Sequence, residues 1–154
     1  MLLERVIETT AAVSATSSRR TKVDLLSRCL HEAAADQGGQ ARVVELATHY
    51  LAGALPQRRL GMSRQGLRDL PGPALTASIT VLDVDDAMAR IMDASGRGVV
   101  QARRHVLHHL FVRSTAAEQR WLAAVISGDL RQGAGEGLIL QAVAHTAGLE
   151  VSIL

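Results

Sequence analysis

Apolar residues recur every three or four positions along most of this 154-residue chain, in runs separated by polar or glycine-containing segments. This spacing is typical of helices with one buried face. Residues 76–84 have the composition of a strand, but the chain offers that strand no partner. We therefore expect a single all-α domain over residues 1–154, a compact fold of seven or eight helices. They are predicted at about 2–13, 19–35, 41–52, 80–94, 99–112, 115–127 and 138–147, with a short helix after Ser63.

The segment from Thr115 to Gly148 has the most specific local pattern. Thr115 and Glu118 have the spacing of a capping box, in which each side chain accepts a hydrogen bond from a backbone N–H. Gly128 stands where a left-handed residue ends a helix. Three glycines then alternate before the last apolar run: Gly133, Gly135 and Gly137. Because glycine lets a backbone lie close to another group, and a helix start offers free N–H groups, this segment predicts a site that an anion can approach.

The composition indicates a protein with a buried core and no internal disulfide. Hydrophobic residues make up 47% of the chain, which is ample to fill a core at this length. The single cysteine, Cys29, lies on the apolar side of its helix, so we expect a core thiol. Charges interrupt the N-terminus and no apolar run approaches about 18 residues, so we expect no signal peptide, no membrane span and a cytoplasmic protein. The predicted core includes Leu122, Val125 and Ile126 on the helix at 115–127, and Ala102, Val106, Leu110 and Phe111 on the helix at 99–112.

Arginine supplies nearly all of the positive charge. The chain has 17 Lys and Arg against 15 Asp and Glu, and Lys22 is the only lysine. Residues 56–68 and 97–113 each hold four arginines and no acid. Because a guanidinium group binds phosphate through two hydrogen bonds, this segregation predicts a basic face. An arginine-rich, alanine-rich composition is equally typical of a GC-rich genome.

No segment has the residues of a complete catalytic or metal site. His105, His108 and His109 share a helix face, but no acid or cysteine at matching spacing completes a metal site. The alternating glycines lack the preceding strand of a dinucleotide-binding loop, and the chain has no P-loop. The residues leave two functions open: binding of a nucleic-acid duplex through its backbone, or a helical protein–protein interaction module with a basic face. The scarcity of aromatic residues argues against base stacking on single strands.

The most specific resemblance to a known family is carried by SGDLRQGAGEGLILQAVAHTAG at residues 127–148. It is similar to G-E-L-R-x-G-x-x-E-G followed by an apolar helix, a motif of the N-terminal DNA-binding domain of ATP-dependent DNA ligases. Just upstream, RSTAAEQRWLAAVI resembles the bacterial form of that domain. Further matches are ATSSRRTKVDLLSRCL, LAGALPQRRLGMS and DVDDAMARIMDASGRGVVQARRHVLHHLF. The resemblance covers nearly the whole chain in order and is strongest to the actinobacterial type.

This resemblance implies a DNA-binding role within a larger enzyme. Complete members seal nicks through an adenylate on a lysine, using ATP and a divalent metal such as Mg²⁺. Their N-terminal domain grips nicked double-stranded DNA through the minor groove and the phosphates on both sides of the nick, without sequence preference. The resemblance further implies adenylation and OB-fold domains as partners, a monomer, a nucleoid location and no cofactor in this domain. The nucleophile motif Lys-x-Asp-Gly is absent, so we expect no enzyme activity from this chain alone and a truncation before the catalytic domains.

The resemblance also indicates which residues contact DNA. It places Gly128, Arg131, Gly133 and Gly135 in a turn that enters the groove. Weaker matches are Arg19 and Lys22 on the early helix, and Arg58, Arg59, Gly61 and Arg64 in and around a glycine-bearing loop. Asp129 departs from those relatives that have a basic residue at this position, so it is not expected to contact DNA. Glu136 is expected to anchor the start of the last helix.

Overall fold

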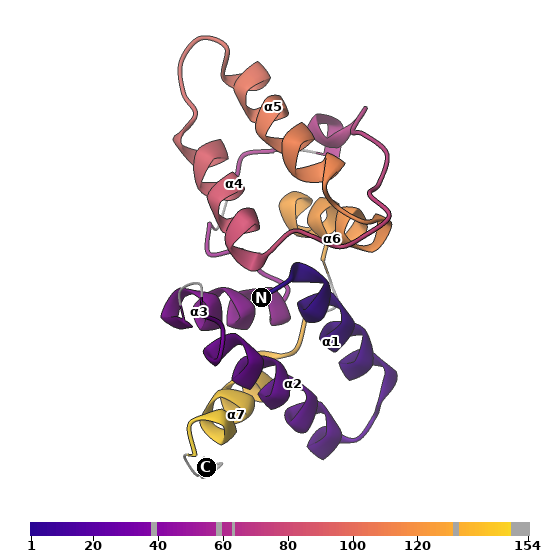
Figure 1. The fold of residues 1–154 in the computed structure, drawn as a ribbon, viewed down its shortest axis with the longest axis vertical. Coiled ribbons are helices and arrows are strands. Elements are labelled where there is room, and N and C mark those ends of the chain that lie inside the picture. Colours follow the sequence, from indigo (N-terminus) through magenta and orange to yellow (C-terminus); the bar gives the residue numbers. More distant parts are fainter. Residues whose placement is uncertain (38–39, 58–59, 63, 131–132, 149–154) are drawn as a thin grey trace.

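The structure, a computed structural model, describes residues 1–37, 40–57, 60–62, 64–130 and 133–148. Across these residues the fold consists of seven α-helices and one short 3-10 helix, without a strand, so the all-α prediction is confirmed (Figure 1). None of the described helices combines the length and the apolar composition that crossing a membrane requires. The elements are α1 (Leu3–Ala15), α2 (Arg19–Ala34), α3 (Gln40–Leu51), η1 (Arg64–Leu67), α4 (Val81–Asp93), α5 (Val99–Val112), α6 (Ala116–Ser127) and α7 (Glu136–Thr146).

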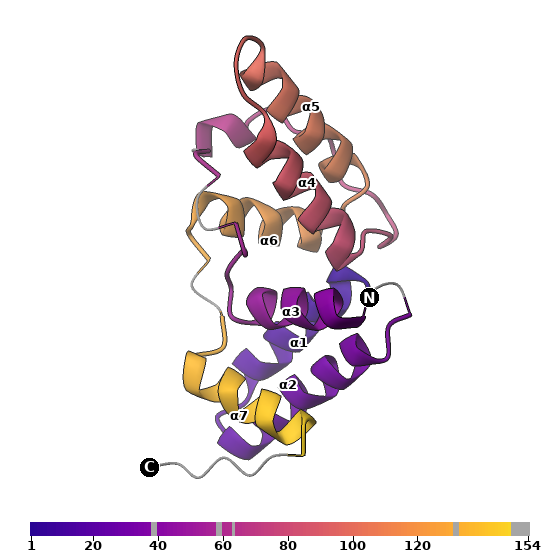
Figure 2. The same ribbon diagram turned by 90° about the vertical axis from the view of Figure 1, so that its left-hand side faces the viewer.

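The helices form two halves of an elongated molecule. One half contains α1, α2, α3 and α7, and the other contains α4, α5 and α6 (Figures 1 and 2). The N-terminus lies between the halves, where the N–H of Leu3 donates to the carbonyl of Ile79 at 3.0 Å and the N–H of Val81 to that of Met1 at 3.0 Å. The last helix, α7, returns to the first half and packs across α2, so the segment between α6 and α7 passes from one half to the other.

Local sequence signals set the helix boundaries. The capping box predicted for Thr115 and Glu118 is confirmed, and Thr80 with Asp83 forms a second one at the start of α4. Helix α6 ends at Gly128, whose φ of +75° confirms the predicted left-handed residue. Thr80 makes only an isolated bridge with Leu2, so the strand-like composition of residues 76–84 produces no strand.

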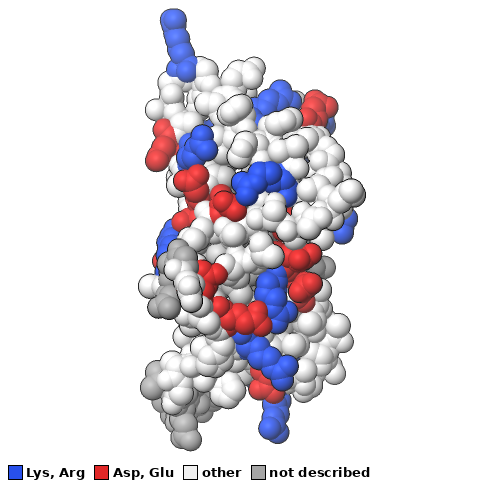
Figure 3. Space-filling model, viewed as in Figure 1, with Lys and Arg blue, Asp and Glu red and all other residues white. Residues whose placement is uncertain are grey.

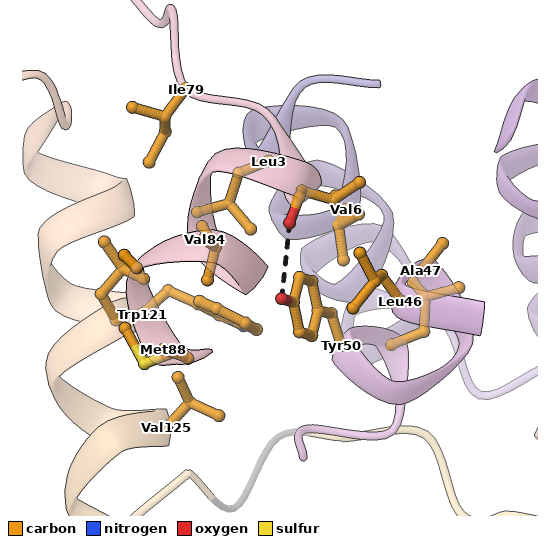
Figure 4. Packing of buried hydrophobic residues seen from close by; sticks show 14 of the residues in the cluster. Leu3, Val6, Leu46, Ala47, Tyr50, Ile79, Val84, Met88, Trp121 and Val125 are labelled. Atoms are coloured by element: carbon orange, nitrogen blue, oxygen red, sulfur yellow. Dashed lines mark hydrogen bonds between the residues drawn. The ribbon is translucent and has the colours of Figure 1, made fainter. Parts of the chain in front are cut away.

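The core joins the two halves through an aromatic pair. Tyr50 of α3 and Trp121 of α6 pack edge to face, with ring centroids 5.3 Å apart and an interplanar angle of 64°. Aliphatic side chains from α1, α3, α4 and α6 surround the pair (Figure 4). The Tyr50 hydroxyl lies 3.5 Å from the carbonyl oxygen of Val81, toward which it donates. Such pairs contribute about 0.5–1.5 kcal/mol beyond the area they bury.

The first prediction tests this junction. Trp121→Ala removes one ring and leaves a cavity between α3 and α6, so we expect the free energy of unfolding to fall by about 3–5 kcal/mol. Urea unfolding followed by circular dichroism measures the change. Val100→Ala, at a side chain that is 72% exposed, is the matched control and should change stability by less than about 0.5 kcal/mol. Equal losses in the two variants would contradict a central role for Trp121.

Candidate nucleic-acid interface

Helix α3 ends in a tight turn closed by a glycine. Gly53 has a φ of +74°, a left-handed conformation that favours glycine. Its N–H donates to the carbonyl of Tyr50 at 3.0 Å, and the N–H of Ala54 donates to that of His49 at 3.0 Å. This pair of hydrogen bonds is the Schellman motif, which satisfies carbonyl groups at the end of a helix. Gly53 was not among the predicted site residues, although a glycine after an apolar helical run is the signal that identified Gly128.

Helix α6 ends in the same way. The N–H of Gly128 donates to the carbonyl of Val125 at 3.3 Å, and the N–H of Asp129 donates to that of Ala124 at 2.8 Å. The two turns face one open groove of about 640 Å³. The groove is lined by Gly53, Ala54, Leu55, Gln57, Leu60, Gly61, Met62, Val125, Ile126, Ser127 and Gly128. The fold therefore brings two predicted site residues, Gly61 and Gly128, to one surface.

Gly133 packs directly against the end of α3. The N–H of Ala134 donates to the carbonyl of Leu51 at 2.8 Å, which draws the chain onto the last turn of α3. A Cβ atom at Gly133 would lie 2.0 Å from the carbonyl oxygen of Ala52 and 2.8 Å from the nitrogen of Gly53. The missing side chain thus leaves room for another part of the protein, a structural role that the sequence did not predict. Its contact with DNA stays a prediction.

Gly135 differs from Gly133 in its surroundings. It is the N-cap of α7, has no side-chain cap, and a Cβ atom added to it would meet nothing within 4 Å. Glu136 is in the first turn of α7, as expected for an acid that stabilises a helix start. A second open hollow, lined by Thr48, His49, Ala52, Leu130, Gly133, Ala134, Gly135, Glu136 and Ile139, lies at this point. Nothing inside the described protein explains why residue 135 lacks a side chain.

The Gly61 loop extends this surface toward α5. Gly61 has a φ of +63° and open space around it. Together with Met62 it lines both the groove and a third hollow, whose other wall includes Arg103 and Arg104 of α5. We call the surface formed by residues 53–57, 60–62, 127–130 and 133–136 the turn face. Figure 2 shows the segments that follow α3 and α6 running side by side along one edge of the molecule.

One predicted cation, Arg64, is held at the turn face. Its Nη2 atom lies 2.8 Å from Oδ2 of Asp129, although the Arg64 side chain is 79% exposed. The Ser127 hydroxyl lies 3.1 Å from the same carboxylate oxygen and 2.8 Å from the carbonyl oxygen of Ala123, and its one proton is shared between these acceptors. This ion pair connects η1 to the turn after α6, so Arg64 and Gly128 lie close together, as a shared contact with DNA requires.

The other predicted cations are placed differently. Arg19 and Lys22 lie in the first turns of α2, and Nε of the exposed Arg19 donates to Oε1 of Gln141 on α7 at 3.1 Å. The structure therefore places Arg19 beside the middle of α7 and not at the groove. The predicted contacts Arg58, Arg59 and Arg131 lie outside the described residues.

One face of the molecule carries charges of both signs. On the face shown in Figure 3, acidic side chains gather across the middle of the molecule and basic ones lie among them. Several arginines are paired with acids from other elements. Arg42 lies 2.7 Å from Asp85, and this pairing raises the pKa of the Arg42 guanidinium. The face in Figure 3 is therefore not the basic face that we expected.

Cys29 and the three histidines of α5 are the remaining candidates for catalytic or metal-binding chemistry. Cys29 is buried in the core, as predicted, and burial raises the pKa of its thiol, which disfavours the nucleophilic thiolate. His105, His108 and His109 are exposed on α5. The part of the chain that the structure describes contains no group of three side chains able to hold a metal ion.

Comparisons with known proteins agree with the resemblance noted in the sequence. Residues 70–144 match the protein family described as "DNA ligase N terminus". The "Probable DNA ligase" of Beutenbergia cavernae is 44% identical over 149 residues, which are 97% of this chain and 28% of that protein. "DNA ligase B" of Mycobacterium tuberculosis (strain CDC 1551 / Oshkosh) is 42% identical over 97% of this chain and 29% of its own length. The chain thus spans less than a third of the length of these relatives, and no solved structure matches it.

The two glycines that flank Ala134 provide a second prediction. Gly133→Ala forces a Cβ atom into the backbone of Ala52, so we expect a loss of about 1–3 kcal/mol of unfolding free energy. Gly135→Ala, whose φ of −59° suits alanine and whose surroundings are open, should cost less, about 0.5 kcal/mol, because alanine is a poorer N-cap than glycine. Thermal or urea unfolding of both variants makes the comparison. A stable Gly133→Ala protein would mean that this backbone contact does not form.

Proposed function

Because the chain belongs to the DNA ligase N terminus family, we propose that it binds nicked double-stranded DNA without sequence preference, through the minor groove and the phosphate backbone. The observation that carries this proposal is the turn face. Helices α3 and α6 end at Gly53 and Gly128, and both of these turns line one groove. A third glycine turn, at Gly61, lines the same groove. The family suggests a role in DNA binding, and this surface is the one best suited to the backbone of a duplex.

Exposed glycines suit the minor groove for a steric reason. That groove is only about 6 Å wide, and its base edges distinguish little beyond A·T from G·C pairs. Gly128 and Gly135 offer a backbone with open space where a side chain would stand, so sugar and phosphate groups can approach closely. Contacts of this kind position a protein on DNA and carry no sequence information directly. A ligase that serves nicks of any sequence needs such contacts.

Phosphate groups on either side of the groove require cations. Arg64 beside the groove, and Arg103 and Arg104 in the adjoining hollow, are described residues that can supply them. By the family resemblance, Arg58, Arg59 and Arg131 would add further contacts, and Arg19 with Lys22 would reach a more distant part of the duplex. Arginine is well suited to these roles because its planar fork matches two phosphate oxygens.

The proposal places the chemistry elsewhere in the parent protein. The relatives named DNA ligase are more than three times as long as this chain. We propose that the parent seals nicks through an enzyme–adenylate, with ATP and Mg²⁺ bound by adenylation and OB-fold domains. This domain would hold the duplex as a monomer in the cytoplasm, at the nucleoid, and would itself bind no cofactor.

A helical protein–protein interaction module is the alternative function. The exposed apolar side chains Leu75, Val100 and Leu140 favour it. Such a module would have no affinity for a nicked duplex even at low salt, and would capture an acidic protein partner instead.

The third prediction concerns salt. If about five phosphates are neutralised, the logarithm of the association constant for a nicked duplex should fall with the logarithm of salt concentration at a slope near −4.5. Fluorescence anisotropy with a labelled nicked duplex measures the slope, and duplexes of unrelated sequence should give the same affinity. An affinity independent of salt, or none at low salt, contradicts the proposal.

A matched pair of variants locates the contact in the same assay. Gly135→Val adds a side chain on the turn face, whereas Gly72→Val adds the same side chain in open space between the two prolines of the loop before α4. We expect about tenfold weaker binding from the first variant, which is about 1.4 kcal/mol, and little change from the second. Equal affinities in two folded variants would move the contact away from α7.

A further inference from the structure

The ion pair between Arg64 and Asp129 joins two residues with opposite expected relations to DNA. Arg64 is a predicted phosphate contact, whereas Asp129 carries a negative charge at the edge of the groove. Yet the guanidinium of Arg64 lies 2.8 Å from the Asp129 carboxylate, and both side chains are largely open to solvent, at 79% and 48% exposed. The free domain therefore already holds an anionic oxygen against the cation that a phosphate would need.

Asp129 is the more firmly held member of this pair. Its backbone N–H closes the turn after α6 by donating to the carbonyl of Ala124 at 2.8 Å. The Ser127 hydroxyl also lies 3.1 Å from the Asp129 carboxylate, although the carbonyl oxygen of Ala123, at 2.8 Å, is the nearer acceptor for the one hydroxyl proton. Arg64, in contrast, lies in the four-residue helix η1. Among the described residues, its side chain pairs with Asp129. The backbone of Asp129 thus holds the carboxylate near the groove edge, and the arginine can exchange partners.

A carboxylate and a phosphate present the same chemistry to a guanidinium group. Both offer two anionic oxygens that accept parallel N–H hydrogen bonds, and both lie at similar distances from the donor nitrogens. An exposed ion pair of this kind is weak, because solvent and salt screen it. A DNA phosphate entering the groove can therefore replace the carboxylate at little cost.

We propose that Asp129 is a built-in competitor of DNA for Arg64. In the free domain its carboxylate occupies the position of a backbone phosphate, and a bound duplex displaces it. The competition lowers the affinity for duplex. This inference rests on the proposed function, since it requires that the turn face binds a duplex.

Two other roles for Asp129 make different predictions. If Asp129 only orients Arg64 toward DNA, its removal weakens binding. If Asp129 only repels phosphates through its charge, its removal strengthens binding equally whether or not Arg64 is present. Of the three roles, only competition predicts that Arg64→Ala lowers the affinity for DNA by a larger factor when residue 129 is a neutral asparagine.

A double-mutant cycle separates these cases. The affinities of the wild-type domain, Asp129→Asn, Arg64→Ala and the double variant are measured for the same nicked duplex by anisotropy. We expect Asp129→Asn to bind about two- to fivefold more tightly, the range that exposed ion pairs span. The loss caused by Arg64→Ala should be larger by the same factor in the Asp129→Asn protein than in the wild type.

The controls distinguish this inference from the function on which it rests. Glu8→Gln removes an equal charge from α1, where Arg5 keeps Glu32 as its partner, and should change affinity less than Asp129→Asn. Unfolding midpoints of all variants should agree, because the pair is exposed. Binding by the wild type with no coupling between the two substitutions, or with coupling of the opposite sign, overturns the competition and leaves the proposed function intact. If the wild-type domain does not bind the nicked duplex, both the competition and the proposed function are overturned.

Discussion

The packing of Gly133 against the last turn of α3 fixes where the chain crosses between the two halves of this domain. The chain leaves α6 in one half and enters α7 in the other, and it crosses between them at the end of α3. There the Ala134 N–H bonds to the Leu51 carbonyl, and Gly133 lies so close to Ala52 that no side chain fits between them. The turns after α3 and α6 can share a groove because this crossing is held in place. The aromatic pair of Tyr50 and Trp121 secures the same junction from within the core.

A surface built from helix ends has a particular kind of specificity. The hydrogen bonds of the turns at Gly53 and Gly128 are made by the backbone, so the conformation of these two turns does not depend on the rotamers of long side chains. Charged groups then act at its border, where Arg64 is paired with a carboxylate in the free domain. Such a surface fits a ligand with a regular backbone and variable bases, and the match of residues 70–144 to the DNA ligase N terminus family suggests a role in DNA binding.

The sequence predicts those features that depend on neighbouring residues. Helix positions, the capping box at Thr115 and the left-handed Gly128 follow from patterns within a few residues, and they are confirmed. Features that depend on distant residues could not be predicted in this way. The partner of Gly133 is the end of α3, which no local pattern identifies. The segregation of arginines along the chain likewise did not reveal that acids of other elements pair with them, as Asp83 does with Arg113 and Asp129 with Arg64. Ala102, predicted in the core, is exposed, and Leu107 is buried instead.

The central claim is that the turn face, and not another surface, meets a nicked duplex. Titration of the isotopically labelled domain with a nicked duplex, followed by amide chemical shifts, tests this most directly. The account predicts that the largest shifts fall on Gly53, Gly61, Gly128 and Gly135, while the exposed residues Glu4 and Glu8 of α1 shift little. Shifts concentrated on α1, with the four glycine amides unchanged in a complex of measurable affinity, would contradict it.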